Sequence, residues 1–201
     1  MKVIIVRHGQ TGDNVRKVIA GQGIDSVLNV EGIEQAKKIA KYLGSEKIDV
    51  AYVSDQTRAV QTLEHILEFH PSVVVTKDKS LRERHYGELE GQPSHTAKDA
   101  AKESGLPYHL FRPKGGESHA DVHKRIGDFF KTLFKKHKDQ TVLIVSHGRA
   151  ISLLLVGILD KPLDEEHQEA HRPENTGLTI LEIFEGKPPK VLTLNSLEHL
   201  N

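Results

Sequence analysis

Short apolar runs alternate along this chain with segments whose apolar residues recur at helical spacing, and this alternation narrows the fold more than any other feature. Valine and isoleucine fill the runs without a polar residue at every second position, which is typical of strands covered on both faces. The expected strands are 3–6, 50–53, 73–76, 141–145 and 178–183, and 191–194 is a candidate edge strand. The expected helices are 30–43, 55–69, 119–137 and 149–159. The alternation predicts an α/β fold, a three-layer αβα sandwich around a mostly parallel central sheet of about five to six strands.

Capping residues and one irregular region refine this division. Asn29 is a suitable cap for the first expected helix and Gly44 a suitable stop, while Ser54 occupies the N-cap position before the second helix. Residues 88–118 are rich in glycine, proline, serine and histidine, with one short helical stretch at 96–103. We expect residues 1–201 to form a single domain, in which 88–118 is an insertion over the sheet edge that acts as a lid or specificity segment.

Composition excludes several classes of partner. Lysine plus arginine and aspartate plus glutamate number 28 each, which argues against a polyanion-binding surface and against nucleic acid as a partner. The chain has no cysteine, which excludes disulfides, thiolate chemistry and cysteine-ligated metals. A run of only four apolar residues precedes Arg7, too few for a signal sequence, and no apolar stretch is long enough to cross a bilayer. We therefore expect a cytoplasmic protein that binds no membrane and exists as a monomer or homodimer.

The first expected strand ends in a permanent cation and a titratable ring, Arg7 and His8, followed by Gly9. No carboxylate lies within five residues of Arg7, so its partner comes either from elsewhere in the fold or from a ligand. Ser146-His147-Gly148 follows a later expected strand in the same way. Ligands bind outside the carboxyl ends of strands in parallel sheets, so we expect both histidines at one edge, where glycine lets the backbone approach a ligand.

A third cation, Arg58, falls in the first turns of the helix expected at 55–69, where the helix dipole disfavours a cation unless an anion compensates. Together with Arg7, His8 and His147 it would form a compact positive pocket. Two arginines with bidentate geometry suit a phosphate or a carboxylate. A lone Arg-His pair after a strand, or Ser-His-Gly alone, is more often a satisfied surface feature, but both at equivalent strand ends, with Arg58 at a third, favour a shared anion site.

Four stretches of the chain carry a family pattern. They are Arg7-His8-Gly9-Gln10-Thr11 with Asn14, Ser54 followed by Thr57-Arg58-Ala59, Leu81-Arg82-Glu83-Arg84-His85-Tyr86-Gly87, and Ser146-His147-Gly148. In order and spacing they resemble the histidine phosphatase (phosphoglycerate mutase-like) superfamily over nearly the whole chain. Gly115-Gly116-Glu117-Ser118, Asn175-Thr176-Gly177 and Asn195 to Leu200 are similar to fructose-2,6-bisphosphatase-like regulators, whereas Glu83 to Gly87 is also similar to cofactor-dependent phosphoglycerate mutases.

The resemblance implies a role for each matching residue. His8 would be the nucleophile that takes the phosphoryl group, and Arg7, Arg58 and His147 would hold the phosphoryl oxygens in the transition state. Glu83 would be the general acid and base, with Glu88 and Glu90 as nearby rivals. Contacts to the substrate are implied for Asn14, Gln22, Gly23, Tyr86 and Gly148. No metal and no cofactor are expected.

Three functions are compatible with this pattern. The first is a metal-independent phosphomonoester hydrolase that acts through a covalent phosphohistidine on a small phosphorylated metabolite, with a sugar bisphosphate such as fructose-2,6-bisphosphate among the candidates. The second is a cofactor-dependent phosphoglycerate mutase, in which a substrate hydroxyl replaces water, and the third is a non-catalytic phosphate-binding domain. Lys98, Arg112 and Lys114 of the insertion either meet a second phosphate or carboxylate or are solvated, so the substrate stays open.

Two further histidines have the spacing of a metal pair. His119 and His123 are four apart, but the segment His-Ala-Asp-Val-His lacks the glutamate of a zinc-peptidase helix. The apolar stripe of this helix is carried by Val122 and Ile126, and we expect both histidines to lie beside it on a solvated face.

Overall fold

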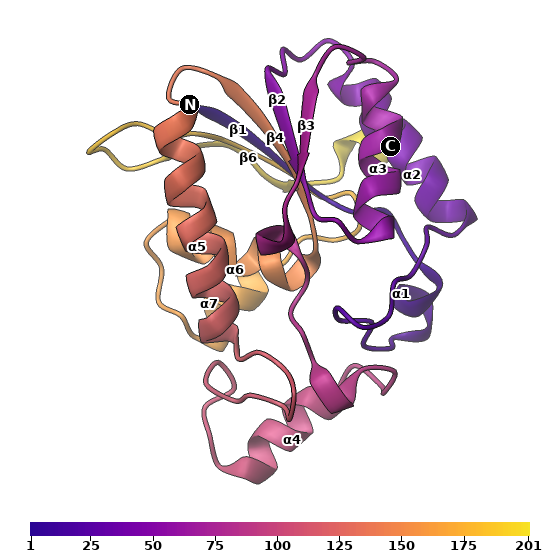
Figure 1. Cartoon of the computed structure of the whole chain (residues 1–201), viewed down its shortest axis with the longest axis vertical. Helices are drawn as coiled ribbons and strands as arrows, with labels where there is room; N and C mark the ends of the chain where they lie inside the picture. Colours follow the sequence, from indigo (N-terminus) through magenta and orange to yellow (C-terminus); the bar gives the residue numbers. More distant parts are fainter.

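The computed structural model describes residues 1–201, and its centre is one six-stranded sheet in the order β3-β2-β4-β1-β5-β6 (Figure 1). The strands are β1 (Lys2–Arg7), β2 (Val50–Val53), β3 (Val74–Lys77), β4 (Thr141–Ser146), β5 (Leu178–Glu182) and β6 (Lys190–Ser196). The first four strands run parallel, whereas β5 pairs antiparallel with both β1 and β6. The predicted α/β class and mostly parallel sheet are confirmed.

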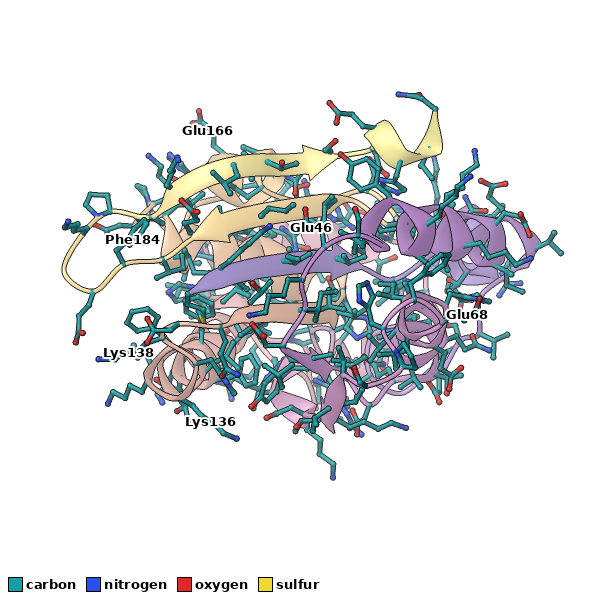
Figure 2. The ribbon with its side chains drawn as sticks, turned by 90° about the horizontal axis from the view of Figure 1, so that it is seen from above. Glu46, Glu68, Lys136, Lys138, Glu166 and Phe184 are labelled. Carbon is teal, nitrogen blue, oxygen red and sulfur yellow. The ribbon has the colours of Figure 1, made fainter.

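Helices cover both faces of this sheet, as Figure 1 shows. The chain forms seven α-helices, α1 (Gly12–Arg16), α2 (Val30–Leu43), α3 (Thr57–Leu67), α4 (Thr96–Ser104), α5 (His119–Lys136), α6 (Gly148–Ile158) and α7 (Glu165–Ala170), of which α2 and α3 cover one face of the sheet and α5 and α6 the other. Successive residues of β1 point to opposite faces, so Ile4 and Val6 pack with α2 and α3 while the alternate residues pack with α5 and α6. Seen from above, the strands lie between the two helix layers, and charged side chains such as Glu68 and Lys136 point outward (Figure 2).

The strand register brings three segments of the chain to one level. Arg7 of β1 pairs with Ser146 of β4, and Val53 of β2 pairs with Val145 of that same strand. Because β2, β4 and β1 are adjacent, the residues that leave their carboxyl ends are neighbours in space. The insertion 88–118, which contains α4, lies beyond this edge in Figure 1.

Several details differ from the sequence-based expectations. The prediction that Ser54 caps the helix after β2 is wrong, because α3 begins at Thr57 with Gln56 as its N-cap, and the Ser54 hydroxyl accepts from the Gln56 N–H. β3 is exposed at all four residues because it is an edge strand. The short helices α1 and α7 were not predicted, since neither is long enough to show an apolar stripe. None of the helices has the length and apolar character needed to span a bilayer.

Candidate active site

The two histidines predicted to meet at the sheet edge lie side by side. The backbone N–H of His8 donates to the carbonyl of Ser146 (3.0 Å), which continues the β1–β4 ladder by one residue. The His8 and His147 rings are tilted at 57° with their centroids 5.1 Å apart, and both residues are buried. The parallel register of two strands therefore sets their spacing.

The His8 ring is held in one tautomer by its own main chain. Nδ1 lies 2.7 Å from the carbonyl oxygen of Gly9, and because a carbonyl only accepts, Nδ1 carries the hydrogen and Nε2 keeps its lone pair. Gly9 in turn packs so closely on α2 that an added Cβ would lie 2.4 Å from the Gly32 carbonyl oxygen. Burial, with Arg58 and Arg7 beside the ring, lowers the pKa of His8 well below its ordinary value. His8 is thus a neutral imidazole at neutral pH.

Arg58 is a buried cation that contacts no carboxylate. Its Nε donates to Nδ1 of His147 (3.2 Å), and its Nη2 donates to the carbonyl of Gly21 (2.9 Å). His147 therefore carries its own hydrogen on Nε2, and that buried nitrogen has no hydrogen-bond partner. An unpartnered donor next to an uncompensated guanidinium favours an anion as the missing partner.

Arg7 contributes a second guanidinium to the same place. Its Nη1 donates to the carbonyl of Pro173 (2.8 Å), and its Nε has no partner. Burial, reinforced by the neighbouring charge of Arg172, lowers the pKa of Arg7 to about 10, so it remains protonated at neutral pH. Gly148 lies against this guanidinium, with 3.4 Å between an added Cβ and Cζ of Arg7.

Glu83 faces the histidines from the irregular segment before the insertion. Its Oε1 accepts from the backbone N–H of Arg84 (2.8 Å) and of Ala150 (3.2 Å), and its Oε2 accepts from that of Arg149 (3.1 Å). Two of these donors belong to the first turn of α6. The helix that follows His147 thereby positions the acid as well.

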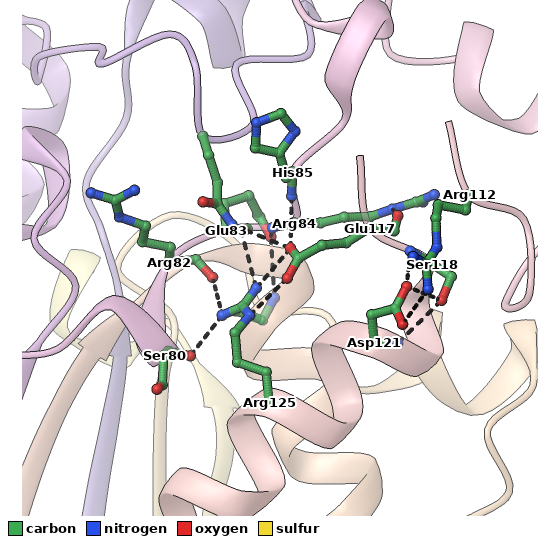
Figure 3. A network of polar contacts seen from close by, with 12 residues as sticks. Ser80, Arg82, Glu83, Arg84, His85, Arg112, Glu117, Ser118, Asp121 and Arg125 are labelled. Atoms are coloured by element: carbon green, nitrogen blue, oxygen red, sulfur yellow. Dashed lines mark hydrogen bonds and ion pairs between the residues drawn. The ribbon is translucent and has the colours of Figure 1, made fainter. Parts of the chain in front are cut away.

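A polar network centred on Arg125 and Glu117 holds the backbone of the segment that carries Glu83 (Figure 3). Arg125 of α5 donates to the carbonyls of Ser80 (2.7 Å) and Arg82 (3.2 Å) and forms two 2.9 Å contacts with the Glu117 carboxylate. Glu117 also accepts from the backbone N–H of His85 (2.9 Å). The position of Glu83 thus depends on side chains from α5 and from the end of the insertion.

A cavity of about 270 Å³ lies at this end of the sheet. Of the predicted residues, the structure brings six to its wall: Arg7, His8, Asn14, Arg58, Glu83 and Tyr86. The side chain of Asn14 also accepts from Asn175 Nδ2 (3.1 Å), which donates in addition to the His8 carbonyl (3.0 Å). His147 stands behind this wall, against the His8 ring.

Other predicted residues lie off the cavity wall. The backbone N–H groups of Gln22 and Gly23 donate to Glu90 (2.9 and 2.7 Å), and the Gln22 amide donates to the Glu83 carbonyl (2.8 Å). The carboxylate of Glu90, one of the two alternative acids, therefore accepts hydrogen bonds from this loop, and the other, Glu88, is exposed. Glu83 is the only carboxylate on the cavity wall. In the insertion Lys98 lines the cavity, whereas Arg112 pairs with Asp121 and Lys114 is exposed.

The expectation of a solvated face is wrong for His119. This residue is fully buried, and its Nε2 accepts from Nη1 of Arg84 (2.7 Å), a guanidinium that stacks 4.6 Å from the centre of the Tyr86 ring. His123 is half-buried, with Nδ1 3.0 Å from the Leu153 carbonyl oxygen. Neither histidine is presented to solvent as a metal ligand.

Among the wall residues that sequence reasoning missed are Tyr108, Arg149 and Arg172. A signal existed for Arg149, because it opens a helix directly after Ser146-His147-Gly148, where the dipole disfavours a cation as it does at Arg58. Nothing comparable marks Tyr108 or Arg172, whose places depend on how the insertion and the segment after α7 fold.

The sheet order and the pocket define a class of α/β proteins in which a neutral histidine stands among arginines at the carboxyl ends of parallel strands. The chain belongs to the histidine phosphatase superfamily (branch 1), whose family model matches residues 3–196. The predicted family is therefore confirmed.

Named relatives give this family membership a finer context. Mouse fructose-2,6-bisphosphatase TIGAR is 40% identical over 129 residues, 63% of this chain and 48% of that protein, so the chain spans about half the length of this relative. The metal-independent phosphoserine phosphatase of Arabidopsis thaliana is 36% identical over 78% of the chain and 68% of its own length. Among solved structures, Bacillus stearothermophilus YhfR superposes with a TM-score of 0.88 at 28% identity, covering 100% of this chain and 99% of that one.

Proposed function

We propose that this protein is a metal-independent phosphomonoester hydrolase that acts on a small phosphorylated metabolite through a covalent phosphohistidine at His8. The observation that carries the proposal is the free lone pair on His8 Nε2 beside two guanidiniums. Membership of the histidine phosphatase superfamily and two relatives named as phosphatases support it.

The first step transfers the phosphoryl group to the protein. The lone pair of His8 Nε2 attacks phosphorus, the ester P–O bond breaks, and a protonated Glu83 gives its proton to the leaving oxygen. The guanidiniums of Arg7 and Arg58 and the Nε2–H of His147 stabilise the charge on the phosphoryl oxygens.

The second step returns His8 to its starting state. Glu83, now ionised, removes a proton from water, the resulting hydroxide attacks phosphorus, and the P–N bond breaks with its electron pair returning to Nε2. Inorganic phosphate is the product, and Glu83 is protonated again for the next turnover.

A phosphoglycerate mutase is the second candidate. It shares the first step, but a substrate hydroxyl takes the phosphoryl group in place of water. Phosphoglycerate mutase-like protein 4 of Arabidopsis thaliana, 28% identical over 99% of this chain and 86% of its own length, favours this candidate. Fructose-2,6-bisphosphate and phosphoserine enter as candidate substrates through the names of the other relatives.

The test is brief exposure to a radiolabelled phosphomonoester followed by an acid and base stability assay of the labelled protein. We expect base-stable, acid-labile label on the wild type and on the control His65→Ala, whose ring pairs with Glu68 away from the cavity. His8→Ala should carry no label and should lose at least about 10³-fold in kcat. Full activity of His8→Ala, or turnover of 3-phosphoglycerate without phosphate release, would overturn the hydrolase proposal.

A further inference from the structure

The cavity carries more positive charge than one phosphoryl group uses. Beyond Arg7 and Arg58, three further cations line it: Lys98 of α4, Arg149 of α6 and Arg172 after α7. Figure 1 shows the elements that carry them: α4 lies in the insertion, and α6 and α7 lie between α4 and the sheet. Glu83 is the only carboxylate among the lining residues, and it is committed to proton transfer.

Arg149 is the most buried of these three cations, with 3% of its surface exposed. Its Nη2 donates to Glu169 (2.7 Å), its Nη1 lies 3.5 Å from the Gln168 oxygen, and its Nε has no partner. Arg172 approaches the same Glu169 carboxylate at 3.6 Å. One carboxylate thus serves two guanidiniums, and the buried Nε–H of Arg149 still lacks an acceptor.

The geometry also ties Arg149 to the proposed acid. Its backbone N–H donates to Glu83 Oε2 (3.1 Å), while its side chain extends from the same residue to Glu169. The Glu83 carboxylate and the Arg149 guanidinium therefore lie no further apart than one extended arginine side chain plus one hydrogen bond. If Glu83 protonates the leaving oxygen, the far end of a leaving group only a few atoms long can contact the Arg149 guanidinium.

We infer that Arg149, assisted by Lys98 and Arg172, binds a second anionic group on the substrate. The substrate class is then a small phosphomonoester whose leaving group carries a carboxylate or a second phosphate. This inference rests on the proposed hydrolase function and narrows it. It shifts the second-anion role from Arg112 and Lys114, which lie off the wall, to residues of α6 and the segment after α7.

The test compares three esters built on one skeleton: 3-phosphoglycerate, glycerol 1,3-bisphosphate and glycerol 3-phosphate. They differ only in a carboxylate, a phosphate or a hydroxyl-bearing carbon at the far end, and phosphate release is measured for each. We expect kcat/KM for the better of the two anionic esters to exceed that for glycerol 3-phosphate by about 10- to 100-fold, the range of a charge-assisted contact. The ranking of the first two esters distinguishes a carboxylate from a phosphate.

Substituting each partner of the Arg149–Glu169 ion pair in turn distinguishes a role of Arg149 in substrate binding from a purely structural role. Arg149→Met should remove most of the preference for the anionic ester, acting mainly through KM. Glu169→Gln should act in the opposite direction and lower KM for the anionic ester about 3-fold, because the competing carboxylate is gone. Lys102→Met, an exposed lysine off the cavity wall, is the matched control and should leave the preference unchanged.

The outcomes are distinguishable. Equal kcat/KM for all three esters, or the same loss on every ester in both Arg149→Met and Glu169→Gln, would overturn the second-anion site while leaving the hydrolase intact. Arg149→Lys, which keeps the charge, guards against a folding defect and should retain part of the preference. No phosphate release from any of the three or from p-nitrophenyl phosphate would instead overturn the proposed function itself.

Discussion

The two ends of the cavity are built in different ways. At the end where we propose that the phosphoryl group binds, here called the phosphate end, His8 and His147 follow directly on the adjacent strands β1 and β4, and Arg58 lies in the helix that follows β2. At the leaving-group end, Glu83 lies on an irregular segment whose backbone is held by Arg125 and Glu117 (Figure 3). Main-chain hydrogen bonds between strands position the first set, and side-chain contacts position the second.

This difference has a functional meaning. A site fixed by strand register keeps its geometry when surface segments change, which suits the phosphoryl group that all candidate substrates share. A site held by loops and side chains can be reshaped, which suits leaving groups that differ between relatives. If the two ends act independently, a substitution at the phosphate end should affect all substrates alike, whereas one at the leaving-group end should discriminate between them.

Removing a phosphate-end cation should slow every substrate equally. Arg58→Ala deletes a buried guanidinium to which we assign the stabilisation of the phosphoryl oxygens, so we expect kcat/KM to fall about 10³-fold on both alkyl and p-nitrophenyl phosphates. Arg16→Ala, an exposed arginine, is the control in the same phosphate-release assay. A loss confined to one class of ester would break the proposed division between the two ends.

Removing the leaving-group acid should discriminate between substrates. Glu83→Gln cannot donate its proton, so we expect about a 10²-fold loss of kcat on alkyl phosphates, whose leaving oxygen needs that proton. On p-nitrophenyl phosphate, which leaves as a stable anion, the loss in the first step should be less than about 10-fold. Burst kinetics would measure that step, and equal losses on the two esters would contradict the assignment of Glu83.

Loosening the support behind Glu83 should have a smaller effect of the same kind. Glu117→Gln weakens the contact with Arg125, and because small misplacements of catalytic groups are costly, we expect kcat on alkyl phosphates to fall about 30-fold with KM little changed. Glu64→Gln, an exposed residue, serves as control. A rise in KM without a change in kcat would show that Glu117 does not act through the acid.

The smallest effect concerns stability. Burial is the main cause that lowers the pKa values of His8, His119 and His147 in the folded protein. Below about pH 6.5, therefore, only the unfolded chain takes up these protons, and the free energy of unfolding decreases as the pH is lowered. Each group contributes about 1.4 kcal/mol per pH unit in that range. His119→Gln should remove the contribution of one histidine to the pH dependence of the free energy of unfolding, which urea unfolding at pH 7 and pH 5 can measure. An unchanged slope would contradict burial of a neutral His119.

How much the sequence predicts follows the same division. The pairing of His8 with His147 was predictable, because any residue that ends a parallel strand arrives at one known edge. The burial of His119 had a signal, since it stands three residues before Val122 and seven before Ile126 on the apolar stripe of α5. The contacts of Arg125 had none, because they depend on how α5 crosses a loop of irregular shape.

The main chain, rather than a neighbouring side chain, sets the orientation of the His8 ring. Its Nδ1–H is fixed by the carbonyl of Gly9, an acceptor that every amino acid has, so exchanging neighbouring side chains cannot turn the ring. Only a displacement of the backbone can do so, and the close contact between Gly9 and Gly32 is where a single added methyl group would cause one. The orientation of the His8 ring should therefore tolerate most side-chain substitutions around it but not a substitution of Gly9 or Gly32.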